Sequence, residues 1–248
     1  MTQSRLDVIA LTETWHEDSD CVPIKRLRSM GLNVLEVARP TFDQPKRDSV
    51  GFINHGGVAV VARTGVALSK ISLNVKATTF EYVCTKIYIK GSSRLLVVIY
   101  RPGSEHPSAD FFSEFNSLLE AVLISGLPVT ITGDINIHLN VDGDVHRAKL
   151  NDILAAFDLT QHVTMPTHDR GGLLDVVITA AADVLCDVAV TKTGRSDHSL
   201  VSWSVNMAPP ELTYHTVTCR QWRNFDVDGF IAAPVSYTHL TLPTNREV

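Results

Sequence analysis

The sequence is poor in cysteine, and the few cysteines are far apart. Four occur in 248 residues, and no two form a Cys-x-x-Cys pair: Cys21, Cys84, Cys186 and Cys219. This spacing indicates neither a zinc cluster nor a disulfide framework. A reducing compartment is therefore the simpler expectation.

Long hydrophobic runs are also missing. The strongest runs, such as residues 95–100, are far shorter than the roughly 18 residues that a membrane span needs. Polar residues rather than a signal sequence follow Met1. We therefore expect an intracellular protein with no membrane partner.

The sequence also lacks an excess of positive charge. Lysine and arginine number 22 against 27 aspartates and glutamates, which gives a formal charge of −5. This balance argues against a protein that holds nucleic acid by bulk charge. It leaves room for a nucleic-acid enzyme whose carboxylates bind a metal and whose basic groups lie on one rim.

The residues that are present favour one globular α/β domain. Hydrophobic residues make up 44% of the chain and charged residues 20%, which allows a substantial core. Apolar runs predict strands at residues 6–12, 32–37, 58–63, 81–89, 94–100, 128–132, 173–179 and 198–205. Helical periodicity and capping signals predict helices at residues 24–30, 108–126 and 144–157. Because periodicity ends after Val205, residues 1–206 form the predicted domain.

Polar residues follow or interrupt several predicted strands, and the ends of strands are where open α/β folds place their sites. They are Glu13, Tyr100, Arg101, Asp134, Asn136, Asp175, Ser196, Asp197 and His198. Taken singly, Glu13 could be a surface carboxylate, residues 133–134 a turn and His198 a histidine satisfied at the core edge. Asp175 is harder to dismiss, because its apolar neighbours would bury it and a buried carboxylate needs a partner.

Phosphodiester hydrolysis would use these residue types. Mg²⁺ takes hard oxygen ligands, for which Glu13 is the best candidate. Asp134 would orient or deprotonate a water, and Asn136 would hold that water or the phosphate. His198, if paired with Asp175, would be kept in one tautomer and made more basic, so that its imidazolium could donate to a phosphate oxygen.

Six strings occur in a fixed order between residues 6 and 205: LTETW, YRPG, GDINIH, PTH, LDVVIT and SDHSLVSW. Together they resemble the endonuclease/exonuclease/phosphatase superfamily, and more closely the apurinic-type endonuclease domain of LINE-type (non-LTR) retrotransposons. Residues 220–230, RQWRNFDVDGF, are similar to the segment that follows this domain in such elements, before their reverse transcriptase.

The resemblance implies a four-layer α/β sandwich of the DNase I-like kind, with two β-sheets packed face to face and helices outside. It implies Mg²⁺ as the cofactor, with Mn²⁺ as a substitute, and a target-site DNA duplex as the partner. The nick would leave a 3′-hydroxyl that primes reverse transcription, which places the protein in the nucleus at the point of action. Element RNA would be a further partner, bound through the reverse transcriptase.

The resemblance also assigns roles to single residues. For the chemistry it implies Asp134 and Asn136 at the water, Tyr100 on the phosphate, and Asp175 with His198 as a dyad. Asp197 would act at the metal or at the leaving group. Thr167 matches a phosphate-contacting threonine, and Arg101 and Ser196 are the other substrate-binding candidates.

The chain departs from the family at both ends. In the family an asparagine on an opening strand, before the glutamate, helps to hold the metal, and Glu13 stands too close to Met1 for that strand to be present. We therefore expect a domain at residues 1–206 that lacks its first strand and leaves a sheet edge open. Residues 207–233 would be a linker toward a missing reverse transcriptase. Residues 234–248 match nothing in the family and are interpreted as a non-native tail.

Several predictions about specificity and function stay open. Loop residues that could contact DNA phosphates, or be solvated charge only, are Lys46, Arg47, Arg101, His168 and Arg170. Trp15 could stack on a base, but we expect it to pack. Two other functions remain as alternatives: a phosphatase of the same superfamily acting on inositol phosphates or sphingolipids, and a catalytically dead remnant that only binds DNA or a partner.

Overall fold

The computed structural model describes residues 6–16, 18–39, 56–89, 91–183, 185–205 and 207, all within the first of the chain's two compact units, Met1–Pro210. Its helices are α1 (Val22–Ser29), α2 (Ala109–Leu123) and α3 (Val145–Ala156). Its strands are β1 (Val8–Thr12), β2 (Asn33–Val37), β3 (Val58–Ala62), β4 (Ala67–Lys70), β5 (Glu81–Ile89), β6 (Ser92–Tyr100), β7 (Val129–Asp134), β8 (Leu159–Gln161), β9 (Asp175–Ala180), β10 (Leu185–Thr191) and β11 (Leu200–Val205). The predicted linker and tail, Met207 apart, lie outside the described residues.

A six-stranded sheet with the order β4-β5-β6-β7-β9-β8 forms the centre of the domain. β6 and β7 run parallel, and the other neighbours run antiparallel. Leucine and β-branched residues at 95–99 are buried on both faces of β6, which suits a central strand. Gly133 lets β7 approach β6, because a Cβ there would lie 2.0 Å from the carbonyl oxygen of Ile99.

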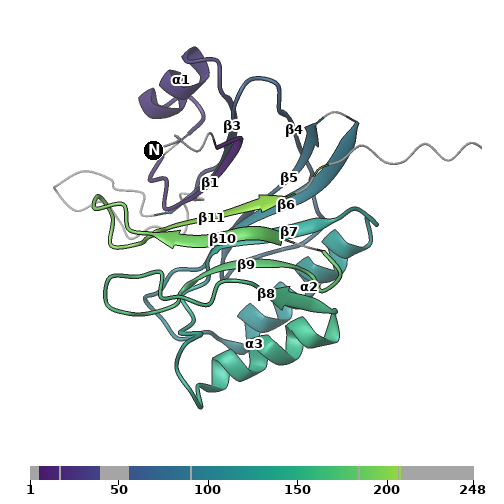
Figure 1. Ribbon diagram of the computed structural model, residues 1–248, viewed down its shortest axis with the longest axis vertical. Helices are drawn as coiled ribbons and strands as arrows, with labels where there is room; N and C mark the ends of the chain where they lie inside the picture. The colour runs from purple at the N-terminus through teal and green to yellow at the C-terminus, as the bar shows by residue number, and fades with distance from the viewer. Residues whose placement is uncertain are drawn as a thin grey trace, which may run out of the picture. The chain divides into compact units, whose positions relative to one another are not determined.

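Helices α2 and α3 cover one face of this sheet (Figure 1). The apolar residues of α2 recur every three or four positions and are buried: Phe111, Phe112, Phe115, Leu118, Leu119 and Val122. Ser108 caps α2 by accepting a hydrogen bond from the amide of Phe111, and Asp144 caps α3 by accepting from the amides of His146 and Arg147. Both helices confirm the prediction made from the helical periodicity of the sequence.

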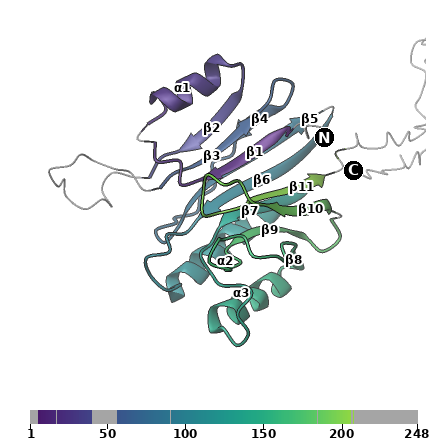
Figure 2. The same ribbon diagram turned by 60° about the vertical axis from the view of Figure 1, so that its left-hand side comes forward.

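The opposite face of the six-stranded sheet is covered by a β layer in two parts, which we call the split layer (Figure 2). One part is the sheet β1-β3-β2 and the other the hairpin β10-β11, both antiparallel. Val60 of β3 shares a buried cluster with Val98, and Trp203 of β11 packs at a second cluster with Val177. Helix α1 lies outside, with Ile24 in the core. The domain is therefore the four-layer α/β sandwich that the resemblance implied.

A groove separates the two parts of the split layer. It has a volume of about 270 Å³ and is lined by residues 8–12 on one side and 199–203 on the other, with Thr132 and Val176 among the remaining lining residues. Among the described strands, β1 pairs only with β3 and β11 only with β10. The edges of β1 and β11 at the groove thus have no strand partner in the described part of the chain.

Three strands were not predicted from the sequence: β4, β8 and β10. They lie at sheet edges, and their sequences are short or mixed in polarity: ALSK, LTQ and LCDVAVT. In β10 the register also shifts between Cys186 and Ala189, and such a shift hides the period of two on which strand prediction depends. No helix among the described residues is long and apolar enough to cross a membrane.

Candidate active site

Three predicted site residues lie side by side on neighbouring strands of the six-stranded sheet. Tyr100 at the end of β6 pairs in register with Asp134 at the end of β7, and Asp134 pairs with Asp175 at the start of β9. Because β6 and β7 run parallel and β9 runs antiparallel to β7, all three residues lie at the same end of the sheet. The structure thus brings these strand termini together.

Asp134 is buried, and Asn136 holds its carboxylate from two sides. Oδ1 of Asp134 accepts the amide N–H of Asn136 at 2.9 Å, and Oδ2 accepts the side-chain Nδ2 of Asn136 at 2.9 Å. Nδ2 of Asn136 also donates to the carbonyl of Arg101 at 2.8 Å. Asn136 has a φ of 50°, a left-handed conformation that is found in strained backbone at functional sites. Asn136 therefore orients Asp134.

The environment of Asp134 changes its acidity. Burial, followed by the charge of Asp175, raises the pKa of Asp134 from 3.8 to about 7, against the opposing charge of His198. A carboxyl group with a pKa near neutrality can take up and release a proton at neutral pH, as a general base must.

His198 and Asp175 form the predicted dyad. Nδ1 of His198 donates to Oδ2 of Asp175 at 2.8 Å, which leaves Nε2 at 3.9 Å from Oδ2 of Asp134. The hydrogen bond to Asp175 raises the pKa of His198 from 6.5 to about 9, although burial opposes it. The ring is therefore an imidazolium at neutral pH. Asp175 itself is half-buried rather than buried.

Glu13 reaches the site from the split layer, at the end of β1. Its Oε1 accepts a hydrogen bond from the hydroxyl of Tyr100, so Tyr100, the predicted phosphate contact, also touches the metal-ligand candidate. Burial, followed by the hydrogen bond to Glu13, raises the pKa of Tyr100, which keeps the hydroxyl a donor. Glu13 and Trp15 both have left-handed φ angles, 49° and 50°, so the turn after β1 is strained.

Ser196 and Asp197 lie on the exposed loop that leads into β11. Oγ of Ser196 accepts the amide N–H of His198 at 3.1 Å. The Asp197 side chain is 70% exposed, and its Oδ2 lies 3.3 Å from Nε2 of His168. Burial acts to raise the pKa of Asp197, but a main-chain hydrogen bond and the charges of His198 and His168 lower it below the usual value. Asp197 is therefore an anion at neutral pH.

Two residues predicted to bind substrate are buried instead: Thr167 completely, and Arg101 with 4% exposed. The hydroxyl of Thr167 accepts the amide N–H groups of Leu174 and Asp175, both at 3.1 Å. The Arg101 guanidinium donates to the main-chain carbonyls of Pro102, Glu105, Ile135 and Asn136. With its donors used in this way, Arg101 is not placed to bind a phosphate. Both residues shape the loops of the site, which corrects their predicted role.

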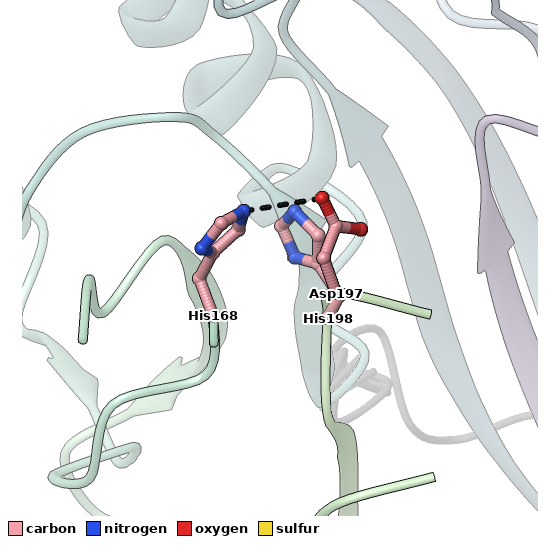
Figure 3. Close-up of side chains that lie close together, drawn as sticks. All are labelled: His168, Asp197 and His198. Atoms are coloured by element: carbon pink, nitrogen blue, oxygen red, sulfur yellow. Dashed lines mark ion pairs between the residues drawn. The ribbon is translucent and has the colours of Figure 1, made fainter. Parts of the chain in front are cut away.

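The acidic side chains of the site suit a divalent cation. The charges of Asp175 and Glu13 both raise the pKa of Asp134, so the carboxylates repel one another across the site. Mg²⁺ is held by one or two carboxylates together with waters, and Glu13 and Asp197 offer such hard oxygen donors. A second group, His168, Asp197 and His198, offers three ligand atoms within 4.8 Å of one another (Figure 3).

Arg39 and His168 belong to the site in ways that the sequence did not indicate. Arg39 pairs with Glu81, and its guanidinium carbon lies 5.7 Å from the centre of the Tyr100 ring. Nothing in the proline-containing segment after Arg39 marks this role. His168, predicted only as a DNA contact, faces Asp197, and the PTH string was its one signal.

The remaining predictions concern loops and surface residues. Trp15, expected to pack, is 52% exposed. Arg170 is exposed, as a DNA contact would have to be. Lys46 and Arg47 lie outside the described residues.

The profile of the Endonuclease/Exonuclease/phosphatase family matches residues 1–198. The chain belongs to this family. The match includes the residues at the end of the six-stranded sheet, together with Glu13 and the loop that carries Asp197. The chain therefore has the fold of a family of nucleases and phosphatases.

Solved structures share the fold. The 3′ phosphatase NExo from Neisseria, bound to a product DNA hairpin, matches with a TM-score of 0.57 and 20% identity, over 82% of this chain and 90% of that chain. The endonuclease domain of TRAS1, a telomere-specific non-LTR retrotransposon, matches with a TM-score of 0.53 and 13% identity, over 71% and 79%. A family protein from Leptotrichia buccalis matches with a TM-score of 0.54 and 14% identity, over 81% and 87%. At these identities the likeness establishes the DNase I-like fold alone. No curated protein sequence matches the chain.

Proposed function

We propose that the domain is a divalent-metal-dependent DNA endonuclease that hydrolyses a phosphodiester bond and leaves a 3′-hydroxyl. The observation that carries this proposal is the continuous set of contacts Asp175–His198–Asp134, with 2.8 Å and 3.9 Å between the facing atoms. A buried base can activate water, and an imidazolium beside it can stabilise negative charge, in the hydrolysis of a phosphate diester.

Each side chain has one task in this proposal. Asp134, kept in place by Asn136, takes a proton from the attacking water. His198, held through Nδ1 by Asp175, presents its Nε2 proton to a non-bridging phosphate oxygen. Tyr100 keeps the carboxylate of Glu13 pointed at the site. A bound Mg²⁺, or Mn²⁺ in its place, would neutralise charge on the phosphate and on the leaving oxygen, with Glu13 and Asp197 as its ligands.

We assign the substrate to target-site DNA of a non-LTR retrotransposon. The resemblance of six ordered strings supports this, as does the fold shared with the TRAS1 endonuclease domain. The nick would prime reverse transcription in the nucleus, on element RNA that a reverse transcriptase holds.

The test is nicking of supercoiled plasmid with Mg²⁺, followed by extension of the nick with a DNA polymerase, which requires a 3′-hydroxyl. We expect relaxed circles that the polymerase extends, loss of nicking with Asp134→Asn, and no effect of Asp152→Asn on the exposed face of α3. Nicks that the polymerase cannot extend would contradict the proposed product.

A phosphatase is the second candidate, and the fold shared with the Neisseria 3′ phosphatase favours it. Release of inorganic phosphate from inositol phosphates, sphingolipid phosphates or 3′-phosphorylated DNA, without plasmid nicking, would support this alternative.

The groove between β1 and β11 favours a third candidate, a remnant that binds DNA without cutting it. Such a chain would bind DNA in a salt-dependent manner, and neither a chelator nor Asp134→Asn would change its affinity for DNA.

For the nuclease we propose that a further strand of the domain lies in the groove between β1 and β11 and is needed for full activity.

A further inference from the structure

Two loops that are distant in sequence are joined by main-chain hydrogen bonds beside the site. The amide of Asp169 donates to the carbonyl of Asp197 at 2.8 Å, and the amide of Ser199 donates to the carbonyl of Thr167 at 2.7 Å. These bonds flank an antiparallel bridge between His168 and His198. The two imidazole rings consequently meet edge to face, with their centres 4.9 Å apart.

The tautomer of His168 follows from its own loop. The amide N–H of Arg170 donates to Nδ1 of His168 at 3.0 Å. A ring nitrogen that accepts a hydrogen bond carries no proton, so the proton of the neutral ring is on Nε2. Nε2 lies 3.3 Å from Oδ2 of Asp197, and Figure 3 shows the two side chains facing each other. The Nε2 proton of His168 therefore faces the carboxylate of Asp197.

This tautomer argues against a metal site at His168, Asp197 and His198, although their ligand atoms lie within 4.8 Å of one another. A protonated Nε2 cannot be a ligand. Moving the proton to Nδ1 would set it against the N–H of Arg170, which donates to the same nitrogen. The three side chains are better described as two imidazole rings beside one carboxylate.

Asp197 needs such support. Its side chain is 70% exposed, so in isolation it would sample several rotamers. Its other oxygen, Oδ1, lies 3.5 Å from Oγ of Ser196.

We propose that His168 is a positioning residue, which fixes the carboxylate of Asp197 next to His198 so that it can serve the metal or the leaving group. The role rests on the proposed endonuclease function, because only there does Asp197 act on the reaction. It goes beyond the predicted function of His168 as a contact to DNA phosphate.

Two substitutions test the roles of the two ring nitrogens of His168 separately. In His168→Asn the side-chain oxygen replaces Nδ1 as the acceptor for the amide of Arg170, but no donor reaches Asp197. In His168→Gln the longer amide places an N–H near the position of Nε2, and the acceptor for Arg170 is lost. The first variant preserves the loop, and the second preserves the bond to Asp197.

We expect His168→Asn to lower kcat for plasmid nicking roughly 10-fold to 100-fold with KM for DNA unchanged, as removal of an outer-shell partner does. We expect His168→Gln to recover most of this loss. In an Asp197→Ala background, His168→Asn should cause no further loss. The control is His162→Asn, which removes the bond between His162 and Thr179 at the far end of β9 and should leave kcat unchanged.

The reverse order, with the asparagine variant active and the glutamine variant inactive, would show that His168 only supports its loop. A rise in KM without a fall in kcat would show that His168 contacts DNA. Either result overturns the proposal. Thermal melting of both variants gives the fraction folded, by which kcat is corrected.

A measurement on the resting protein separates this inference from the proposed function. Nitrogen-15 NMR of the His168 ring should show a protonated Nε2 and an unprotonated Nδ1, whether or not the protein nicks DNA. If plasmid nicking fails and this tautomer is found, the endonuclease proposal falls while the placement of the Nε2 proton of His168 against Asp197 stands. A proton on Nδ1 of the neutral ring would overturn the inference itself.

Discussion

The two β layers of the domain differ in how they are held together. The six-stranded sheet is continuous, and each strand is hydrogen-bonded to the next. The split layer consists of two sheets whose facing edges are separated by the groove of about 270 Å³. Both layers contribute to the site. Asp134 and Asp175 stand on the continuous sheet, whereas Glu13 and Asp197 come from the two parts of the split layer.

This difference separates the two halves of the proposed chemistry. The base candidate Asp134 and its neighbour Asp175 are fixed by strand register, as direct neighbours on β7 and β9. The metal-ligand candidates are placed by side-chain packing and by single hydrogen bonds, such as that from Tyr100 to Glu13. We therefore expect damage to the continuous sheet to unfold the domain, and changes in the split layer to alter activity first.

Breaking the continuous sheet should have the largest effect. Gly133→Ala would place a Cβ 2.0 Å from the carbonyl oxygen of Ile99, at a φ of 132° that L side chains rarely adopt. We expect a loss of about 4 kcal/mol or more in the free energy of unfolding, measured by urea denaturation. Gly194→Ala is the control, because its φ is 66° and nothing lies within 4 Å. It should cost about 1 kcal/mol, and equal losses in the two variants would contradict the close approach of β7 to β6.

Breaking the dyad should affect activity more than stability. Asp175→Asn removes the charge that raises the pKa of His198, so the imidazolium should be lost at a lower pH. We expect kcat to fall about 100-fold and the alkaline limit of the pH–rate profile to move to lower pH. A profile that keeps its alkaline limit would show that His198 does not depend on Asp175.

The prediction from sequence succeeded where one local pattern fixes the outcome. The buried face of α2 follows from Phe111, Phe115 and Leu118 at helical spacing, and the strand ends that carry Tyr100 and Asp134 follow from short apolar runs. Prediction failed where the outcome depends on partners far along the chain. The sequence does not show that the hydroxyl of Thr167 serves the amides of residues 174 and 175.

The same limit applies to charged residues. Arg101 and Arg170 look alike in the sequence, yet one is buried among carbonyls and the other is exposed. Burial depends on which loops the fold brings together, and no local period reports it. The short edge strands β4 and β8 were missed because three or four residues do not establish a period.

Completing the split layer should raise both stability and activity. A chain extended at its amino end by an extended segment that carries an asparagine, designed to pair with β1 and β11, would satisfy the two edges that have no strand partner among the described residues. We expect a gain of about 2 kcal/mol in the free energy of unfolding and about tenfold faster nicking. The control is an extension with the same composition and two prolines, which cannot form the ladder. Equal stability of the two chains would show that the groove does not take a strand.

The most gradual expected effect is the pH dependence of stability without metal. The pKa of Asp134 is raised from 3.8 to about 7 and that of His198 from 6.5 to about 9, so the folded state binds more protons than the unfolded state. The stabilisation from His198 is complete below pH 6.5 and is lost as the pH rises through about 9.

The slope should therefore be negative and no steeper than about 1.4 kcal/mol per pH unit for each group. Urea denaturation at several pH values in a chelator measures it, and His198→Gln should flatten the part above pH 6.5. Stability that rises between pH 7 and 9 would contradict the Asp175–His198 pairing.

The central claim is that Asp134 acts as the base in metal-dependent cleavage of DNA. It is tested most directly by the rate of plasmid nicking, measured for the wild type and for Asp134→Asn with Mg²⁺ and with a chelator. The account predicts nicking by the wild type with Mg²⁺ only, and a rate at least about 100-fold lower for the variant. Equal rates for the two proteins, or nicking that persists in the chelator, would contradict it.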